Sequence, residues 1–105
     1  MNELQLTAIQ SGARIVYIIS ENDTGMHKVG ITKNPNSLGR RLSNLQSGNP
    51  RKLNITAVYH FTEDGQAYAM EQNVLKAFSF NNLGLHDEWF QVSAYQLMKY
   101  IERAK

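Results

Sequence analysis

Three side chains of types that do acid–base or anion-binding chemistry, Tyr17, Arg41 and Glu71, lie in predicted strands and helices. Glu71 is the sharpest case, because on a helical wheel it falls inside the apolar stripe formed by Ala67, Met70, Val74, Leu75 and Phe78. A carboxylate there either stays exposed at the edge of the packed layer or is buried with a partner. Two interpretations stay open: a structural salt bridge, or a metal ligand or catalytic carboxylate.

Two adjacent arginines in the predicted helix 37–46 are expected to face different ways. Leucines at 38, 42 and 45 have the i, i+4, i+7 spacing of an amphipathic helix. Arg41 lies next to this stripe, so we expect it to lean inward, whereas Arg40 faces solvent. An inward guanidinium requires an anion, which Glu71 or a phosphate would supply. The alternative is that Arg41 extends past its leucines to water.

A predicted hairpin contributes a third pair of polar residues. If its loop is centred on residues 22 and 23, Tyr17 stands opposite Lys28 and Ile15 opposite Gly30, all on one side of the ladder. An ammonium beside a phenol favours the phenolate, so this pair could act as a general base; it could equally be an ordinary cross-strand pair. Gly30 inside a strand suggests that a ligand or another chain approaches the backbone closely.

Seven predicted elements position these residues, in the order β-β-α-β-α-β-α. They are strands at 14–20 and 27–31, a helix at 37–46, a strand at 53–61, a helix from the N-cap Asp64 to about Phe80, a strand at 88–92, and a last helix opened by the capping-box pair Ser93 and Gln96. An antiparallel hairpin core covered by helices makes the fold class α+β.

Composition limits the class of protein. The chain has 105 residues and no Cys, which suits one domain, residues 1–105, with an ordinary apolar core and no disulfide or thiolate metal site. It shows no membrane-spanning run, signal peptide, zinc motif or nucleotide-binding loop, so we expect a cytoplasmic protein. Residues 1–52 carry seven cations against three anions, which is compatible with a nucleic-acid-binding face.

Five short motifs occur in a fixed order along residues 14–92: V-Y-I-I, K-V-G-I-T, R-R-L, A-M-E-Q and E-W-F. Together they resemble the GIY-YIG nuclease superfamily, above all its short phage and bacterial branch, whose members read K-I/V-G-I-T and end in E-W-F. The resemblance implies a three-stranded antiparallel sheet flanked by helices, here the hairpin plus one strand, with the short strand near the C-terminal helix 93–104 as an extra. It also implies cleavage of DNA phosphodiester bonds with one divalent metal, Mg²⁺ or Mn²⁺.

The resemblance assigns roles to individual residues. Tyr17 matches the tyrosine of the first motif and would be the base for water, with Lys28 lowering its pKa or supporting the transition state. Gly30 matches the structural glycine of the second motif. Arg41 would stabilise charge on the phosphorane, and Glu71 would hold the metal ion on a phosphate oxygen.

Two positions depart from that family's pattern. Lys28 stands where a second tyrosine is usual, although the short branch commonly has Lys there. The asparagine after the glutamate helix has no secure counterpart, with Asn82 and His86 as the candidates. Loss of that position would weaken or abolish catalysis.

Three functions follow as hypotheses. The first is a metal-dependent DNA endonuclease. The second is a catalytically inactive nucleic-acid-binding module on the same fold, in which phosphate contacts from Lys33, Arg40, Arg51 and Lys52 matter most. The third is an interaction protein in which Glu71 and Arg41 form a structural pair. The chain shows no recognition helix or zinc finger, so sequence specificity has no visible source.

Overall fold

The computed structural model describes residues 12–21, 24–33, 35–48, 52–79 and 89–104. The helices and strands within them are β1 (Ile15–Glu21), β2 (Met26–Thr32), α2 (Pro35–Ser47), β3 (Leu53–His60), α3 (Gln66–Ala77), β4 (Trp89–Gln91) and α4 (Ala94–Ala104). The predicted order of elements is confirmed, and so is the α+β class. Every strand boundary lies within one residue of its prediction.

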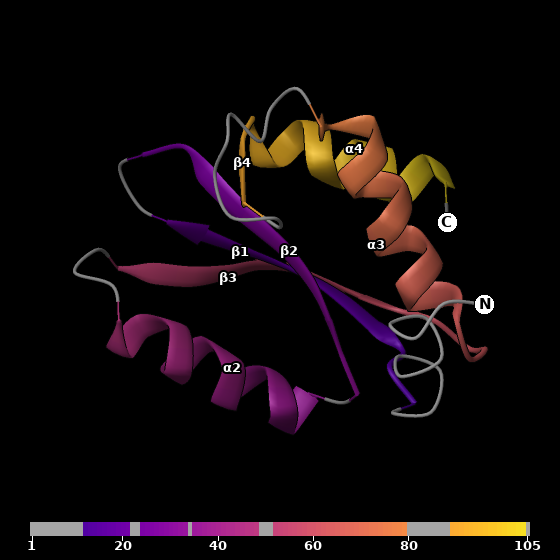
Figure 1. The fold of residues 1–105 in the computed structure, drawn as a ribbon, viewed down its shortest axis with the longest axis horizontal. Coiled ribbons are helices and arrows are strands. Elements are labelled where there is room, and N and C mark those ends of the chain that lie inside the picture. Colours follow the sequence, from indigo (N-terminus) through magenta and orange to yellow (C-terminus); the bar gives the residue numbers. More distant parts are fainter. Residues whose placement is uncertain (1–11, 22–23, 34, 49–51, 80–88, 105) are drawn as a thin grey trace.

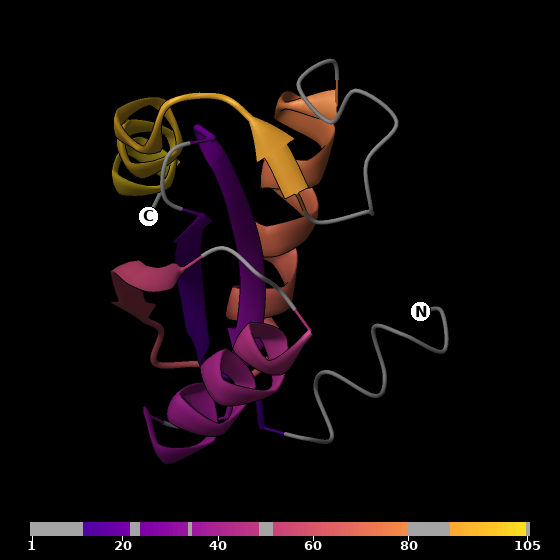
Figure 2. The same cartoon turned by 90° about the vertical axis from the view of Figure 1, so that its left-hand side faces the viewer.

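The four strands form one antiparallel sheet in the order β3-β1-β2-β4. β1 is central, and residues 15–19 are buried on both faces, as their apolar run predicts. The expectation of a three-stranded sheet is wrong, since β4 pairs with β2 through residues 26–28 and 89–91 and lies beside it in Figure 2. β4 thereby covers backbone groups that would otherwise leave β2 with an open edge.

Helices cover both faces of the sheet, α2 on one and α3 with α4 on the other (Figure 1). Because neighbouring residues of a strand point to opposite faces, β1 supplies both cores. Tyr17 and Ile19 pack with Leu38 and Leu53 on the α2 side. The core on the α3–α4 side is larger and consists of Val16, Ile18, Val29, Ala67, Met70, Val74, Phe90, Leu97 and Ile101. Among the described residues, no helix is long and apolar enough to cross a membrane.

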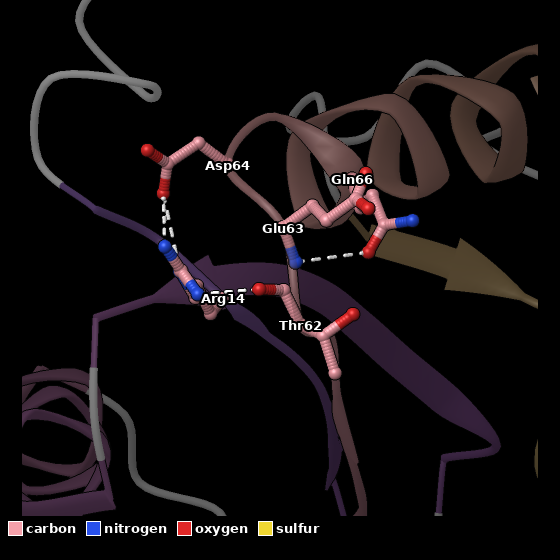
Figure 3. Close-up of polar contacts among 5 residues, drawn as sticks. All are labelled: Arg14, Thr62, Glu63, Asp64 and Gln66. Carbon is pink, nitrogen blue, oxygen red and sulfur yellow. Dashed lines mark hydrogen bonds and ion pairs between the residues drawn. The ribbon is translucent and has the colours of Figure 1, made fainter.

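The two predicted helix caps have different outcomes. At α4, the Gln96 amide donates to Ser93 Oγ at 3.2 Å, as the capping box predicts. At α3 the prediction is wrong: the N-cap is Gly65, with φ +87°, and it makes no side-chain capping bond. Asp64 is instead used by Arg14, whose Nη2 lies 2.8 Å from Asp64 Oδ1 (Figure 3). Asp64 therefore pairs with a distant arginine and does not cap the helix.

The same corner ties the start of β1 to the start of α3. Arg14 also donates through Nε to Asp64 Oδ1 at 3.1 Å and through Nη1 to the Thr62 carbonyl. The Glu63 amide donates to Gln66 Oε1 at 3.1 Å, so it is satisfied by a side chain of the first turn (Figure 3). These contacts orient α3, and with it Glu71, relative to the central strand.

Candidate functional site

Tyr17 lies in the middle of β1, directly opposite Gly30 of β2. Its side chain is 1% exposed and packs in the α2-side core. A Cβ at Gly30 would lie 2.5 Å from Tyr17 Cζ and 3.0 Å from Cε2, closer than carbon atoms pack. The close approach predicted at Gly30 is therefore real, but it is made by the ring of Tyr17 and not by a ligand or another chain.

The predicted hairpin register is wrong by two residues. Tyr17 faces Gly30, and Lys28 stands opposite Ile19, because Glu21 pairs with Met26 and leaves residues 22–25 as a four-residue connection. Gly25 in this connection has φ +72°, a conformation in which glycine is favoured. A shift of two keeps every side chain on its predicted face. Tyr17 and Lys28 are thus diagonal neighbours on the α2 side instead of a direct pair.

Arg41 does not lean inward as expected. Both Arg40 and Arg41 are exposed on α2, whereas Leu38 is buried and Leu42 and Leu45 are half-buried. Arg41 lies at the edge of the leucine stripe, where a long side chain reaches water more cheaply than it buries a charge. The alternative, that Arg41 extends past its leucines, is the one that the structure supports.

Glu71 is buried in α3, which is one of the two placements that its position in the apolar stripe left open. It is 7% exposed and belongs to the same buried surface as Ala67, Met70 and Val74. Burying a carboxylate among apolar neighbours is unfavourable unless an interaction compensates. A buried acid at a helix position where an apolar residue would pack is a signature shared by structural ion pairs and by functional sites.

The structure distributes the three predicted catalytic residues over both sides of the sheet. Tyr17 and Arg41 come from the side that α2 covers, Tyr17 from the sheet and Arg41 from the outer surface of the helix. Glu71 comes from α3, which packs on the opposite face (Figure 1). Their joint catalytic role therefore stays a prediction, and so does that of Asn82 or His86, which lie outside the described residues.

The predicted phosphate contacts gather around α2. Lys33 precedes the helix, Arg40 lies within it and Lys52 follows it, and all three are exposed. Arg51 lies outside the described residues. Beside the C-terminal end of α2, a groove of about 350 Å³ is lined by Leu42, Ser43, Gln46, Ser47 and Leu53. Its hydroxyl and amide groups add hydrogen-bonding capacity to a surface whose charges are cationic.

A polar cluster that the sequence analysis missed lies on the other face, where β1 meets β2. Ser20 Oγ is 2.7 Å from His27 Nδ1 and also bonds the Thr56 hydroxyl. His27 is 9% exposed, and its burial lowers the pKa of the imidazole. The correct register, which pairs Ser20 with His27, would have revealed this contact. His27 is therefore a histidine of the sheet whose ring is hydrogen-bonded to a neighbouring strand.

Glu71 has the right chemistry for a metal ligand, but the described residues offer no complete set of ligands around a metal ion. No three His, Asp or Glu side chains come together as a ready metal site in the parts of the chain that the structure describes. Mg²⁺, however, is commonly held by one or two carboxylates with the substrate's phosphate and water completing its shell. The chemistry of Glu71 suits that ion, although 7% exposure leaves little of the residue open.

Comparison with known proteins corrects the family. No curated protein and no solved structure matches the chain, but one family model, that of the T5orf172 domain, matches residues 14–105. The GIY-YIG assignment is wrong: its motifs are short, and at least one, around Gly30, is explained by packing of Tyr17. T5orf172 domains are nuclease-like and associated with DNA. Because the match begins at Arg14 and runs to the last residue, the chain belongs to the T5orf172 domain family.

Proposed function

We propose that this domain binds DNA through the surface of α2 and acts as an endonuclease that hydrolyses a phosphodiester bond. The observation that carries the proposal is the charge of that surface. α2 contains two exposed arginines and no acidic residue, and exposed lysines flank it at positions 33 and 52. A cluster of exposed cations of this kind neutralises phosphates and supplies most of the affinity of DNA binding.

Arg41 is the group best suited to the reacting phosphate. A guanidinium donates two parallel hydrogen bonds to phosphate oxygens and keeps its charge at every physiological pH. Held at the edge of α2, it would stabilise the negative charge that develops as the phosphodiester bond breaks. Arg40, on the solvent side of the helix, would contribute to binding but not to the chemical step.

Glu71 is the proposed metal-binding residue. A divalent ion bound there would supply Lewis-acid stabilisation of a phosphate oxygen. Glu71 itself needs only to stay ionised and to keep its carboxylate oxygens directed by α3. The base for the attacking water is assigned to Tyr17, with Lys28 as the neighbouring cation. Since Tyr17 is 1% exposed, Tyr17→Phe decides whether its hydroxyl acts in catalysis or in packing.

A catalytically inactive DNA-binding module is the second candidate. It is favoured by the burial of both Tyr17 and Glu71, which keeps a phenol and a carboxylate away from any substrate on the surface. In that case the cations around α2 would bind DNA in the same way, but no bond would be cleaved. The two candidates therefore share their binding surface and differ only in turnover.

Plasmid nicking measured together with duplex binding separates the candidates. Supercoiled plasmid is incubated with the protein and Mg²⁺ or Mn²⁺, beside Arg41→Gln, Glu71→Gln and the control Lys76→Gln, an exposed cation of α3 outside the proposed surface. The endonuclease predicts metal-dependent nicking by wild type and control. It predicts loss of nicking in both other variants, with duplex binding retained by Glu71→Gln.

Other outcomes are equally decisive. Duplex binding by wild type without nicking in either metal would establish the inactive module. Nicking that persists in Glu71→Gln would remove Glu71 from the site. Absence of both binding and nicking would overturn the proposal altogether.

A further inference from the structure

Helices α3 and α4 lie on the face of the sheet opposite α2 (Figure 1), and a second basic surface lies between the end of α3 and α4. Its groove has a volume of about 600 Å³ and is lined by Phe78, Tyr95, Gln96, Lys99, Tyr100, Arg103 and Ala104. Sites for small organic groups have volumes of roughly 300–1,000 Å³. The groove is therefore large enough for a planar heterocycle with an attached sugar phosphate.

The aromatic side chains of the groove differ in how they are packed. Phe78 makes edge contacts with Tyr100, at 5.6 Å between ring centroids, and with Phe90, at 6.5 Å. The Tyr100 hydroxyl donates to the Asn73 carbonyl at 3.4 Å. These contacts anchor the part of the groove nearest the core. Tyr95, by contrast, is 68% exposed, although aromatic rings of soluble proteins are usually covered.

Cations accompany the exposed ring. Lys99 Nζ lies 5.4 Å from the centroid of the Tyr95 ring, within cation–π range, and Arg103 follows one helical turn later. Tyr95, Lys99 and Arg103 are spaced by four residues and therefore share one side of α4. No acidic residue is among the described residues that line the groove. Burial raises the pKa of the Tyr59 phenol on β3, and the nearby carboxylate of Glu102 raises it further.

From this arrangement we infer that the α3–α4 groove binds unpaired nucleotides of single-stranded DNA, with a base stacked on Tyr95 and backbone phosphates paired with Lys99 and Arg103. Aromatic rings alternating with cations are how proteins bind single strands without reading sequence, since every base has a stacking face and every nucleotide a phosphate. A duplex hides those faces within its stack. The inference extends the proposed function, on which it rests, by adding a single-strand contact remote from the duplex-binding surface.

An acidic peptide is the competing occupant, because it too would pair with Lys99 and Arg103. It offers no planar group for Tyr95, whose exposure would then be unexplained. The two ligands are therefore distinguished by whether the ring of Tyr95 contributes to binding. Tyr95→Phe keeps the ring and Tyr95→Ala removes it, and neither affects the core because this side chain is largely exposed.

Fluorescence anisotropy with a labelled oligothymidylate, a labelled duplex of equal length and a labelled oligoglutamate tests the inference. We expect Tyr95→Ala to weaken oligothymidylate binding about tenfold, the usual scale for loss of one stacked base, and Tyr95→Phe to restore it. Combining Lys99→Gln with Arg103→Gln should lower the salt slope of single-strand binding by about 0.7 for each lost phosphate contact. Lys76→Gln, which removes a cation outside the groove, should leave single-strand binding unchanged.

The duplex probe separates failure of this inference from failure of the proposed function. One outcome is that Tyr95→Ala leaves oligothymidylate binding unchanged, while Arg40→Gln combined with Arg41→Gln still abolishes duplex binding. That outcome would refute single-strand binding at the groove and would leave the proposed duplex binding by the α2 surface intact. An equal loss of duplex and single-strand binding in Tyr95→Ala would overturn the assignment to unpaired bases. Tight, Tyr95-independent binding of oligoglutamate would assign the groove to an acidic peptide. Wild type that binds neither DNA probe would overturn both proposals.

Discussion

The two sides of the sheet divide stability and surface chemistry differently. On the α2 side, one leucine of the helix is buried and two are half-buried, and the helix presents cations to solvent. On the other side, α3 and α4 pack on each other and share the larger core with β1, β2 and β4. α2 is therefore the thinner layer of the fold, whereas the α3–α4 layer holds most of the buried apolar residues.

The largest expected effect is the loss of stability when a core residue of the α3–α4 side is truncated, compared with truncation of a residue of α2. Phe90 is fully buried and packs in the α3–α4-side core, so Phe90→Ala should lower the free energy of unfolding by about 3–5 kcal/mol. Leu42→Ala, which truncates a half-buried residue of α2, should lower it by about 1 kcal/mol. Urea unfolding followed by circular dichroism measures both. Equal losses would contradict the view that α2 is the thinner layer.

Two glycine substitutions on the α2 side should change stability in opposite directions. Gly30→Ala places a methyl group against the buried ring of Tyr17 and should cost about 1–3 kcal/mol, because neither strand can move without disturbing the sheet. Gly39→Ala is the matched control, since a Cβ there meets nothing within 4 Å. It should raise stability by about 1 kcal/mol through helix propensity. The same urea titrations report both effects.

The Gly30 prediction has its own internal check. Loss of stability in Gly30→Ala should be partly relieved by Tyr17→Ala, which removes the ring that the new methyl group meets, so the two changes should be strongly non-additive. Additive losses would show that Gly30 is needed for its backbone and not for the space it leaves. That result would reopen the expectation of a ligand at this position.

Local pattern was enough to predict the elements and the face of the sheet on which the strand residues lie. The apolar run of β1, the alternation in β3 and the leucine spacing in α2 identify the strands and helices. The apolar stripe of α3 singles out Glu71 and leaves its burial open, and the structure shows it buried. Parity along a strand survives a register error of two residues. For that reason Tyr17, Lys28 and Gly30 lie on the predicted face even though their partners differ.

Interactions between residues far apart in the sequence could not be predicted in the same way. Asp64 is a good N-cap by type, but Arg14, fifty residues earlier, takes its carboxylate. Arg41 lies at the border of a helical face, where the choice between burial and solvent depends on what the facing surface offers. Short motifs led to the wrong family for a related reason, since a residue such as Gly30 is constrained by the packing of Tyr17 and its presence says nothing specific about function.

The smallest expected effect is a loss of stability in acid caused by His27, which pairs with Ser20 near the start of β2. This loss is absent at alkaline pH, where histidine is neutral in both the folded and the unfolded chain. Burial lowers the pKa of His27 from its ordinary value of 6.5, so the folded protein binds fewer protons than the unfolded chain as the pH falls through and below that value. Acid therefore favours unfolding in this window, and stability is regained as the pH rises.

Thermal melting between pH 8 and about 5.5 should show a falling melting temperature for the wild type. The slope should be smaller in His27→Asn, which keeps a polar atom near the position of Nδ1 for Ser20 Oγ. The matched control is His60→Asn, at the exposed end of β3, which should keep the slope of the wild type. A wild-type slope in His27→Asn would show that the acid sensitivity arises elsewhere in the sheet.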